Sequence, residues 1–422
     1  MNRIVLIGNG FDLAHGLKTS YADFINWYWE QWKRELILCH CSILEDPLCS
    51  IELDTEETEF TQWHGFLMQK SITYQQMSGM EFYEAFNDGG LAIMKKTPLL
   101  TRICHSIETK GWVDIEADYY ALLKECLKKN SITEVRKLHK HFAYLQEKLI
   151  EYLLEIQAKS TNKNLVLSSI KDKIYEPISP YDIAIGAQKK FREWMFERGN
   201  GNEIQNVLDY YQYEASIQKA RTPINIKTYQ EGLFKSDEMW NHLNHNNPVL
   251  VSDNIMLVNF NYTNIASLYV SPRIREHFQL NNIHGTLDNP QSVIFGYGDE
   301  MDKYYQELED LNDNNYLTHI KSSKYLDASN YRKLLQFAES APFQIYIMGH
   351  SCGNSDRTLL NTLFEHENCI SIKPFYYKKE DGADNYTEIA QNISRNFKDK
   401  QALRAKVVPK DCCEPLPQAS EN

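Results

Sequence analysis

Short apolar runs occur near both ends of the chain, whereas helical spacing dominates its middle. Residues 4–7, Ile-Val-Leu-Ile, form a run typical of a strand that is buried on both faces of a parallel sheet. From residue 21 to about residue 243, the apolar residues mostly recur three and four apart. The clearest example, over residues 135–156, predicts a seam between packed helices, which is either a core face or a partner-binding face.

Strands return after about residue 245, where short apolar runs alternate with helical patterns. The expected strands cover residues 255–259, 279–283, 293–295, 344–348 and 369–372. The expected helices cover residues 263–269, 330–338, 356–366 and 385–396. Such alternation is typical of an α/β fold with a mainly parallel, Rossmann-like sheet. Because the strand at residues 3–7 has no strand nearby in sequence, we expect it to join this C-terminal set.

The same pattern predicts the domain organisation. Residues 1–19 plus 245–400 would form one discontinuous α/β domain, and residues 20–244 would form a large all-helical insertion. Within the insertion, we expect two late helices, at residues 183–195 and 204–219. A turn at residues 199–202 would join them. The tail at residues 401–422 contains several prolines and is predicted to be loosely ordered.

Bulk composition limits the class of protein. The length of 422 residues is enough for two or three domains, and 42% apolar residues can form a large core. No stretch approaches the ~18–20 consecutive apolar residues of a membrane span, and no signal peptide precedes the first strand, so we expect a cytoplasmic protein without membrane association. Nine scattered cysteines fit reduced thiols. The net charge of −12 disfavours general nucleic-acid binding.

A glycine-rich turn ends the first strand. Gly8, Asn9 and Gly10 let the backbone turn tightly and approach a ligand closely, and Phe11 and Asp12 then begin a helix. A strand, a glycine-rich turn and a helix are typical of a nucleotide phosphate site. The spacing matches neither G-x-G-x-x-G nor a P-loop, so a plain tight turn is the alternative.

Polar groups follow three more of the predicted strands. Asn261 comes after the strand at 255–259, His284 after the strand at 279–283, and Gly349-His-Ser351 after the strand at 344–348. Because ligands bind beyond the carboxyl ends of parallel strands, four such groups on one edge predict a site. Each group also has a structural alternative, as a helix cap, a hydrogen-bonded turn histidine or a serine that bonds local backbone.

The order of these motifs resembles the sirtuin-like NAD-binding superfamily. More closely, the chain resembles the AbiH family of bacterial phage abortive-infection proteins, over roughly residues 1–375. The motifs that carry this resemblance are Ile-Gly-Asn-Gly-Phe-Asp-Leu at 7–13, Trp-Val-Asp-Ile-Glu at 112–116, Asn-Phe-Asn-Tyr-Thr at 259–263 and Ile-His-Gly at 283–285.

The resemblance implies a sirtuin-like fold and an anti-phage effector in the bacterial cytoplasm that hydrolyses NAD to nicotinamide and ADP-ribose. Asn261 and His284 lie where the superfamily has its catalytic pair. The NAD-binding residues implied are Gly8, Asn9, Gly10, Phe11, Asp12, Asn259, Gly349 and Ser351. A second copy of the chain or a phage-derived trigger are further partners that this setting suggests.

The chemistry of nicotinamide release suits these residue types. The reaction passes through an oxocarbenium-like state, as in glycoside cleavage, and needs an oriented nucleophile and a base near neutral pKa. The Asn261 amide can donate and accept at once, and a histidine such as His284 titrates near neutral pH. Asp114 and Glu116 are additional candidates. They are either the cap and first-turn carboxylate of a helix at 115–129, or carboxylates that reach the cationic nicotinamide ribose.

The chain departs from the superfamily pattern at several points. The usual Gly-Ala-Gly-x-Ser turn ends in Asp12 here, and the Asp that often follows the Asn-Tyr pair is Thr263. No pair of C-x-x-C units is present, so we predict no zinc and no other metal. These departures disfavour protein deacylation.

Two other functions compete with NAD hydrolysis. The site could belong to a non-catalytic nucleotide sensor of phage defence. Alternatively, Gly-His-Ser-Cys-Gly at 349–353 fits the nucleophile elbow of a serine hydrolase, with Ser351 as nucleophile. The hydrolase is disfavoured because the histidine that follows, His366, lies on a helix that leads away from the serine.

Overall fold

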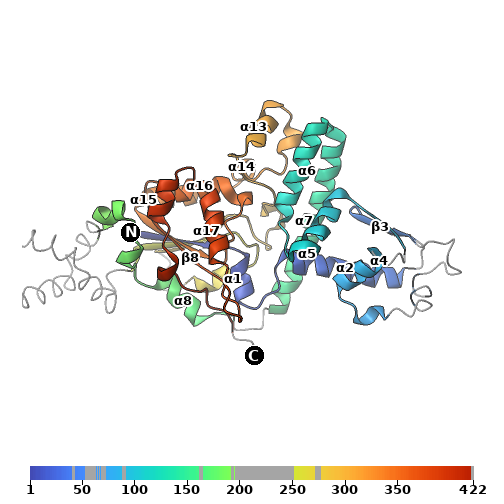
Figure 1. Ribbon diagram of the computed structural model, residues 1–422, viewed down its shortest axis with the longest axis horizontal. Coiled ribbons are helices and arrows are strands. Elements are labelled where there is room, and N and C mark those ends of the chain that lie inside the picture. The colour runs from blue at the N-terminus through green and yellow to red at the C-terminus, as the bar shows by residue number, and fades with distance from the viewer. Residues whose placement is uncertain are drawn as a thin grey trace, which may run out of the picture.

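The computed structural model describes residues 1–39, 43–52, 63, 65, 67, 73–87, 92–160, 165–191, 194, 251–270 and 277–419. Its centre is a five-stranded parallel sheet with the order β6–β5–β1–β7–β8 (Figure 1). The strands are β1 (Asn2–Ile7), β5 (Asn254–Asn259), β6 (Phe278–Asn282), β7 (Phe343–Met348) and β8 (Cys369–Phe375). The fold is therefore mixed α/β, as the alternating pattern predicted.

The first strand lies in the middle of the sheet. β1 pairs in parallel with β5 on one side and with β7 on the other. The side chains of Ile4, Val5, Leu6 and Ile7 are fully buried, because helices cover both faces of the strand. The prediction that this strand joins the C-terminal set is confirmed.

One predicted strand is wrong. Residues 293–295 follow the short 3₁₀ turn η7 (Pro290–Ser292) and belong to no strand. The run is apolar for a different reason, since the Phe295 ring stacks on Phe142 of a long helix at a centroid distance of 4.5 Å. An apolar run this short does not distinguish a strand from a loop that packs on helices.

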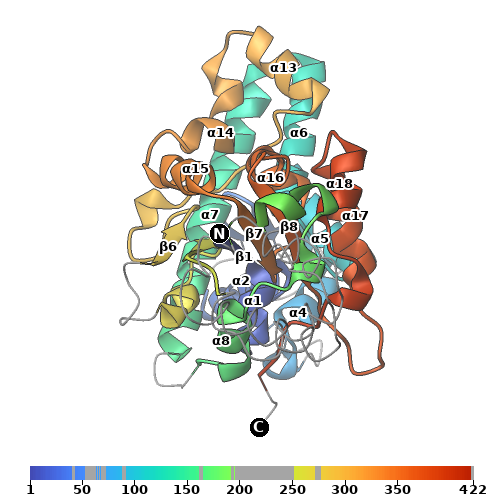
Figure 2. The ribbon, with the colours of Figure 1, turned by 90° about the vertical axis from the view of Figure 1, so that its left-hand side faces the viewer.

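Two helical layers cover the sheet. Ile4 and Leu6 of β1 face a core formed with α15 (Asn330–Ser340), α16 (Arg357–Phe364) and α17 (Tyr386–Arg395). Val5 and Ile7 face the opposite core, which contains α1 (Asn9–Ala14), α8 (Ser168–Tyr175) and the 3₁₀ segment η5 (Ile265–Tyr269). Figure 2 shows α15 and α16 on one side of the sheet and α1 and α8 on the other. This alternation follows from the period of two in a strand.

A separate group of helices packs beside the sheet. It consists of α2 (Tyr21–Leu38), α4 (Gly79–Asn87), α5 (Pro98–Lys110), α6 (Ile115–Lys129) and α7 (Ile132–Ser160) (Figure 1). The apolar seam at 135–156 is confirmed as a core face, because its side chains from Val135 to Tyr152 are buried against the other helices. A capping box between Ser20 and Asp23 begins α2.

The prediction of an all-helical insertion is wrong. β2 (Ile43–Glu45), β3 (Cys49–Glu52) and β4 (Ile93–Lys96) form a three-stranded antiparallel sheet inside it. In β3, buried and half-exposed residues alternate, which is the pattern of a strand with one covered face. The strands are too short for this alternation to stand out in the sequence.

The hydrophobic cores cross the predicted domain boundaries. Ile170 and Ile174 of α8 pack on the sheet, although the sequence assigned them to the insertion. Conversely, Phe295, Tyr316 and Ile320 pack in the core of the helical group. Accordingly, α13 (Lys303–Asp310) and α14 (Lys321–Lys324) lie beside α6 in both views (Figures 1 and 2). The exact division into domains stays a prediction.

The C-terminal tail is packed rather than loosely ordered. It begins with α18 (Lys400–Lys406), after which Val407 pairs with Ile372 of β8. Leu416 is buried against the sheet core, because it covers apolar surface next to β8. The described part of the tail, up to residue 419, is therefore part of the folded α/β body.

The remaining predicted elements fall largely outside the described residues. In the expected helix at 183–195, a 3₁₀ turn, η3 (Ile185–Ala187), precedes helical residues 188–191. The expected helix at 204–219 and the turn at 199–202 lie outside the described part of the chain. Among the described helices, none has the length and apolar character that crossing a membrane requires.

Two turns at the carboxyl edge of the sheet touch backbone to backbone. A Cβ at Gly8 would lie 2.5 Å from the Cα of His350, and a Cβ at Gly349 would lie 2.0 Å from the backbone nitrogen of Phe11. Gly349 also has a φ of +74°, a backbone conformation that residues with a side chain rarely adopt. Only glycine at these positions allows β1 and β7 to end so close together.

Replacing Gly349 by Ala is therefore expected to destabilise the protein strongly. The left-handed φ costs about 1–2 kcal/mol, and the backbone clash adds about 1–3 kcal/mol. Gly382→Ala is the matched control, because Gly382 has a φ of +86° but no atom within 4 Å of the added Cβ. Denaturant unfolding should show a larger loss for Gly349→Ala. Equal losses in the two variants would contradict the close approach of the two turns.

Candidate functional site

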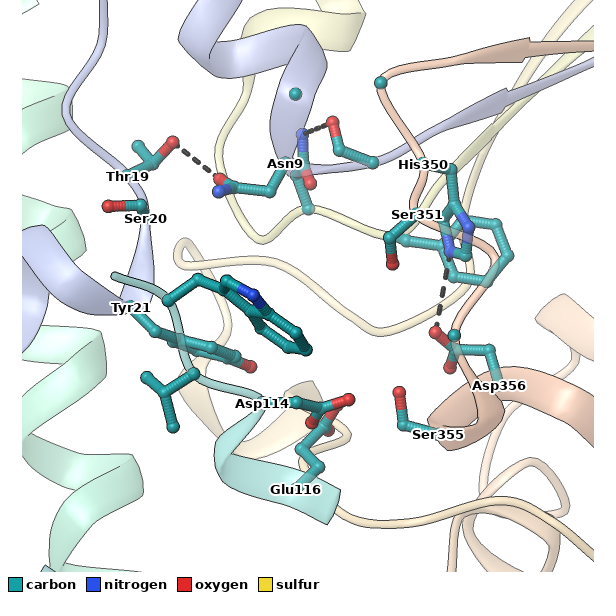
Figure 3. Close-up of a pocket in the computed structure, with 18 of the residues that line it drawn as sticks. Asn9, Thr19, Ser20, Tyr21, Asp114, Glu116, His350, Ser351, Ser355 and Asp356 are labelled. Carbon is teal, nitrogen blue, oxygen red and sulfur yellow. Dashed lines mark hydrogen bonds and ion pairs between the residues drawn. The ribbon is translucent and has the colours of Figure 1, made fainter. Parts of the chain in front are cut away.

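A cavity of about 790 Å³ lies at the carboxyl edge of the sheet. It is bounded by the segments that follow β1, β5, β6 and β7 and, on the other side, by the starts of α2 and α6. Figure 3 shows Asn9 after β1 and Ser351 after β7 across the cavity from Asp114 and Glu116 of the α6 start. This volume is within the range of about 300–1,000 Å³ that is usual for small-molecule sites. The residues predicted from sequence that line it are Gly8, Asn9, Gly10, Asp12, Asp114, Glu116, Asn261, His284, Gly349 and Ser351.

Two predicted ligand-binding residues do not line the cavity. The Phe11 ring is fully buried in the sheet core, where it packs against His15 and Tyr269. The Asn259 amide is also buried, donates to Asn282 Oδ1 at 3.0 Å and accepts from the backbone N–H of Asn261 at 3.2 Å. Both residues stabilise the turns rather than face a ligand.

The glycine-rich turn is closed by protein hydrogen bonds. The N–H of Gly10 donates to the carbonyl of Gly349 at 2.8 Å, and the N–H of Phe11 donates to the carbonyl of Gly8 at 2.9 Å. These two donors are therefore occupied and do not form a phosphate cradle of the kind the motif suggested. The exposed side chain of Asn9 remains at the cavity, where its Oδ1 accepts from Thr19 at 2.7 Å. Arg395 of α17 lines the same cavity and supplies a positive charge there.

Asn261 is held by Asp12. Its Nδ2 donates to Asp12 Oδ1 at 2.9 Å and to the carbonyl of Gly8 at 3.0 Å, while Thr263 Oγ1 donates to Asp12 Oδ2 at 2.6 Å. Both carboxylate oxygens of Asp12 are thus occupied, so Asp12 orients Asn261 rather than contacting a ligand. Both amide protons of Asn261 are also occupied, which leaves Oδ1 for a ligand. The alternative of a helix cap is wrong, because the residue preceding η5 is Asn264.

Burial controls the charge of Asp12. The side chain is 1% exposed. Burial raises the pKa of Asp12 to about 7, although the hydrogen bonds from Thr263 and Asn261 oppose this rise. The carboxyl that orients Asn261 therefore titrates near neutral pH.

His284 lies in a buried charge cluster that the sequence did not reveal. Its Nε2 is 3.3 Å from Asp356 Oδ1 and 3.2 Å from the hydroxyl of Tyr325. The Nζ of Lys321 is 2.7 Å from the same Asp356 oxygen, and Lys321 is only 1% exposed. His350 approaches the other oxygen of Asp356, with its Nε2 at 3.5 Å. Asp356 thus joins two histidines and a buried lysine.

The cluster fixes the charge of its members. Burial lowers the pKa of His284, and the Lys321 ammonium lowers it further, while Asp356 acts in the opposite direction. Although burial opposes ionisation, the Lys321 ammonium, together with the hydrogen bond from His284, holds the pKa of Asp356 well below its usual range. Asp356 is therefore a carboxylate, and His284 is a neutral imidazole, at neutral pH.

The carboxylates at the start of α6 have different surroundings. Glu116 accepts from the N–H of Gly296 at 2.9 Å and lies 3.1 Å from Lys321, while burial raises its pKa to about 8. Asp114 caps α6, because its Oδ1 accepts from the N–H of Ala117 at 2.9 Å. The cap interpretation is thus confirmed for one oxygen of Asp114, yet both side chains also line the cavity.

Ser351 lacks the partners of a hydrolase nucleophile. The non-glycine residue with a positive φ in this turn is the buried Cys352, at +55°, rather than Ser351. His350 next to it already uses both ring nitrogens, since Nδ1 accepts from the N–H of Cys352 at 3.0 Å and Nε2 faces Asp356. Within the described part of the chain, no hydrogen bond links Ser351 Oγ to a histidine.

Among the residues that the structure describes, no group of three or more His, Cys, Asp or Glu side chains could hold a metal ion. The acidic and histidine side chains near Asp356 are instead balanced by the Lys321 ammonium. The prediction that no metal is bound stays a prediction.

These features define an α/β protein with a ligand-sized cavity at the carboxyl edge of a parallel sheet, the usual place for a site in such sheets. The family profile of Bacteriophage abortive infection AbiH matches residues 4–377. The chain therefore belongs to the AbiH family, and this membership supports a role in phage abortive infection. Searches of curated proteins and of solved structures found no match to the chain.

The raised pKa of Asp12 predicts how stability depends on pH. Its native pKa of about 7 lies above its ordinary value of 3.8, so the folded protein binds the proton more tightly than the unfolded chain. The stability of the parent relative to Asp12→Asn should fall as the pH rises from about 4 to about 7, by up to about 4 kcal/mol. Denaturant unfolding at several pH values measures this difference.

Asp313→Asn is the control for this series. Asp313 lies on the surface, and hydrogen bonds from Asn315 lower its pKa below the ordinary 3.8. Its effect on stability should therefore change only in more acidic solution than that of Asp12. A difference between the parent and Asp12→Asn that stays flat between pH 4 and pH 8 would contradict the burial of a titrating Asp12.

Proposed function

We propose that the chain is an abortive-infection effector that hydrolyses NAD to nicotinamide and ADP-ribose. The observation that supports this most is that Asn261 and His284, from the ends of two neighbouring strands, line one cavity and are each held by a buried carboxyl group. Asp12 holds the first, and Asp356 holds the second. An amide and an imidazole oriented in this way suit the activation of a nucleophile.

His284 supplies the base in this proposal. Because Asp356 is ionised, the proton of His284 is stabilised on Nε2, which faces that carboxylate at 3.3 Å. Nδ1 then carries the lone pair, and in the described part of the chain no hydrogen bond involves it. Nδ1 is thus the atom that would accept a proton from water or from a ribose hydroxyl.

Asn261 orients the attacking nucleophile in this proposal. With both amide protons committed to Gly8 and Asp12, Asn261 Oδ1 is fixed as an acceptor beside the cavity. An acceptor held in this way can receive a hydrogen bond from the attacking hydroxyl and keep its lone pair directed at the anomeric carbon.

The charges around the cavity suit a cationic transition state. Asp356 is ionised, and Asp114 adds a second carboxyl group whose pKa burial raises. The pKa of Glu116, about 8, keeps that group largely protonated at neutral pH, so it adds little charge. Arg395, at the same cavity, is the side chain that would contact the negatively charged pyrophosphate.

The first test is nicotinamide release from NAD by the purified chain, measured alone and with an extract of phage-infected cells. His284→Ala should lower turnover roughly 10²–10⁴-fold, because it removes the base. Asn261→Ala should lower turnover while NAD binding is largely kept. If the parent releases nicotinamide and both folded variants match it, these two residues are not the catalytic pair.

Stability must be measured alongside activity. His284 is only 3% exposed, so its replacement can also lower the stability of the fold. His284→Gln is therefore a useful companion, because its amide can still donate toward Asp356 but cannot act as a base. A melting temperature near that of the parent together with lost turnover would support the catalytic role.

A second test addresses Asp356. Asp356→Asn keeps the shape of the side chain but removes the charge that holds the proton on His284 Nε2 and balances Lys321. We expect turnover to fall about 10–100-fold, together with a lower melting temperature, because a buried lysine loses an ionic partner. Unchanged turnover in this variant would contradict the role of Asp356 in orienting the base.

A further inference from the structure

Three side-chain oxygens from separate segments surround one open point in the cavity. The Cβ that Gly353 lacks would lie 3.6 Å from Ser351 Oγ, 3.8 Å from Asp114 Oδ2 and 3.9 Å from Ser355 Oγ. Apart from Gly353 and its two chain neighbours, no described atom lies closer to this point than ordinary van der Waals contact. Figure 3 shows Asp114, Ser351 and Ser355 facing the same open space.

All three oxygens are available to a ligand. Asp114 uses Oδ1 to cap α6, and this is its one hydrogen bond within the described part of the chain. Across the same described residues, no hydrogen bond involves Ser351 Oγ or Ser355 Oγ. The group therefore offers one strong acceptor and two hydroxyls that can donate or accept.

We propose that this group, the Gly353 subsite, binds the 2′,3′-diol of the ribose from which nicotinamide is cleaved. A carboxylate that accepts from ribose hydroxyls is a common way to recognise an unphosphorylated ribose. The two serines can satisfy the remaining donors and acceptors of the diol. This inference rests on the proposed NAD hydrolysis, and it adds the part of the substrate that the site recognises.

The position of the subsite assigns it to the ribose that carries nicotinamide. Ser355 directly precedes Asp356, whose carboxylate lies 3.3 Å from His284 Nε2. The subsite therefore adjoins the proposed base, where the scissile bond must lie. Asp114 and Asp356 also line the same cavity. A phosphate on this ribose would face both carboxyl groups and be repelled.

Binding of ADP-ribose and ADP to the full-length chain tests this inference without catalysis. The two ligands share the adenosine diphosphate, but only ADP-ribose has the second ribose. Isothermal titration calorimetry should show that ADP-ribose binds roughly tenfold or more tightly, a difference of about 1.4 kcal/mol or more, because hydrogen bonds to a charged carboxylate are stronger than those between neutral groups.

Gly353→Ala is the decisive variant. Gly353 has φ −65° and ψ 167°, which alanine adopts without strain, so the added methyl fills the subsite and leaves the backbone unchanged. It should remove the preference for ADP-ribose while ADP binding stays near that of the parent. Asp114→Asn should act in the same direction, because asparagine keeps the helix cap but presents a donor in place of Oδ2.

Gly186→Ala is the matched control, since Gly186 has open space around its added Cβ and is not one of the residues that line the cavity. A clear ADP-ribose preference that Gly353→Ala abolishes would support the subsite, even if the parent releases no nicotinamide and the proposed hydrolysis fails. Equal binding of the two ligands by the parent, or a preference that survives both Gly353→Ala and Asp114→Asn, would overturn it.

Discussion

The hydrogen bond from the N–H of Gly10 to the carbonyl of Gly349 joins the turns after β1 and β7, and the site depends on it. It holds two backbone segments so close that no side chain fits between them. The Asn261 amide then bonds to the carbonyl of Gly8, and His350 follows Gly349 directly. Three strand ends are thereby fixed relative to one another before any ligand is present.

A buried lysine organises the other half of the site. Lys321 is bonded to Asp356 and Glu116 in an environment with almost no access to water. Removing Asp356 would leave the buried Lys321 ammonium without its ionised partner, which is costly. The lysine also connects the sheet side of the cavity, through Asp356, with the helical side, through Glu116.

The sequence predicted those features that follow from strand topology. Asn261 and His284 could be found because each follows an apolar run, and parallel strands bring such ends to one edge. Lys321 and Asp356 could not, because Lys321 begins the four-residue helix α14 and Asp356 directly precedes α16, a helix with an ordinary amphipathic pattern. Their partners come from distant parts of the chain, which no local pattern encodes.

Two departures from the sirtuin-like sequence pattern, at Asp12 and Thr263, lie in contact in the structure. In that pattern a serine is usual at the position of Asp12, and an aspartate is frequent at the position of Thr263. Here the Thr263 hydroxyl donates a hydrogen bond to the Asp12 carboxylate at 2.6 Å. Read separately, each departure weakens the resemblance. Together they form one carboxylate–hydroxyl pair. The sequence did not predict this pair because the two residues are far apart along the chain.

The central place of β1 has a consequence for the order in which the protein is made. β1 leaves the ribosome well before its two neighbours, which begin at Asn254 and Phe343. A nascent or truncated chain that stops before β7 has an unpaired edge on β1 and contains neither Gly349 nor Asp356. The cavity therefore cannot assemble until most of the chain has been synthesised, so an incomplete product carries no working site.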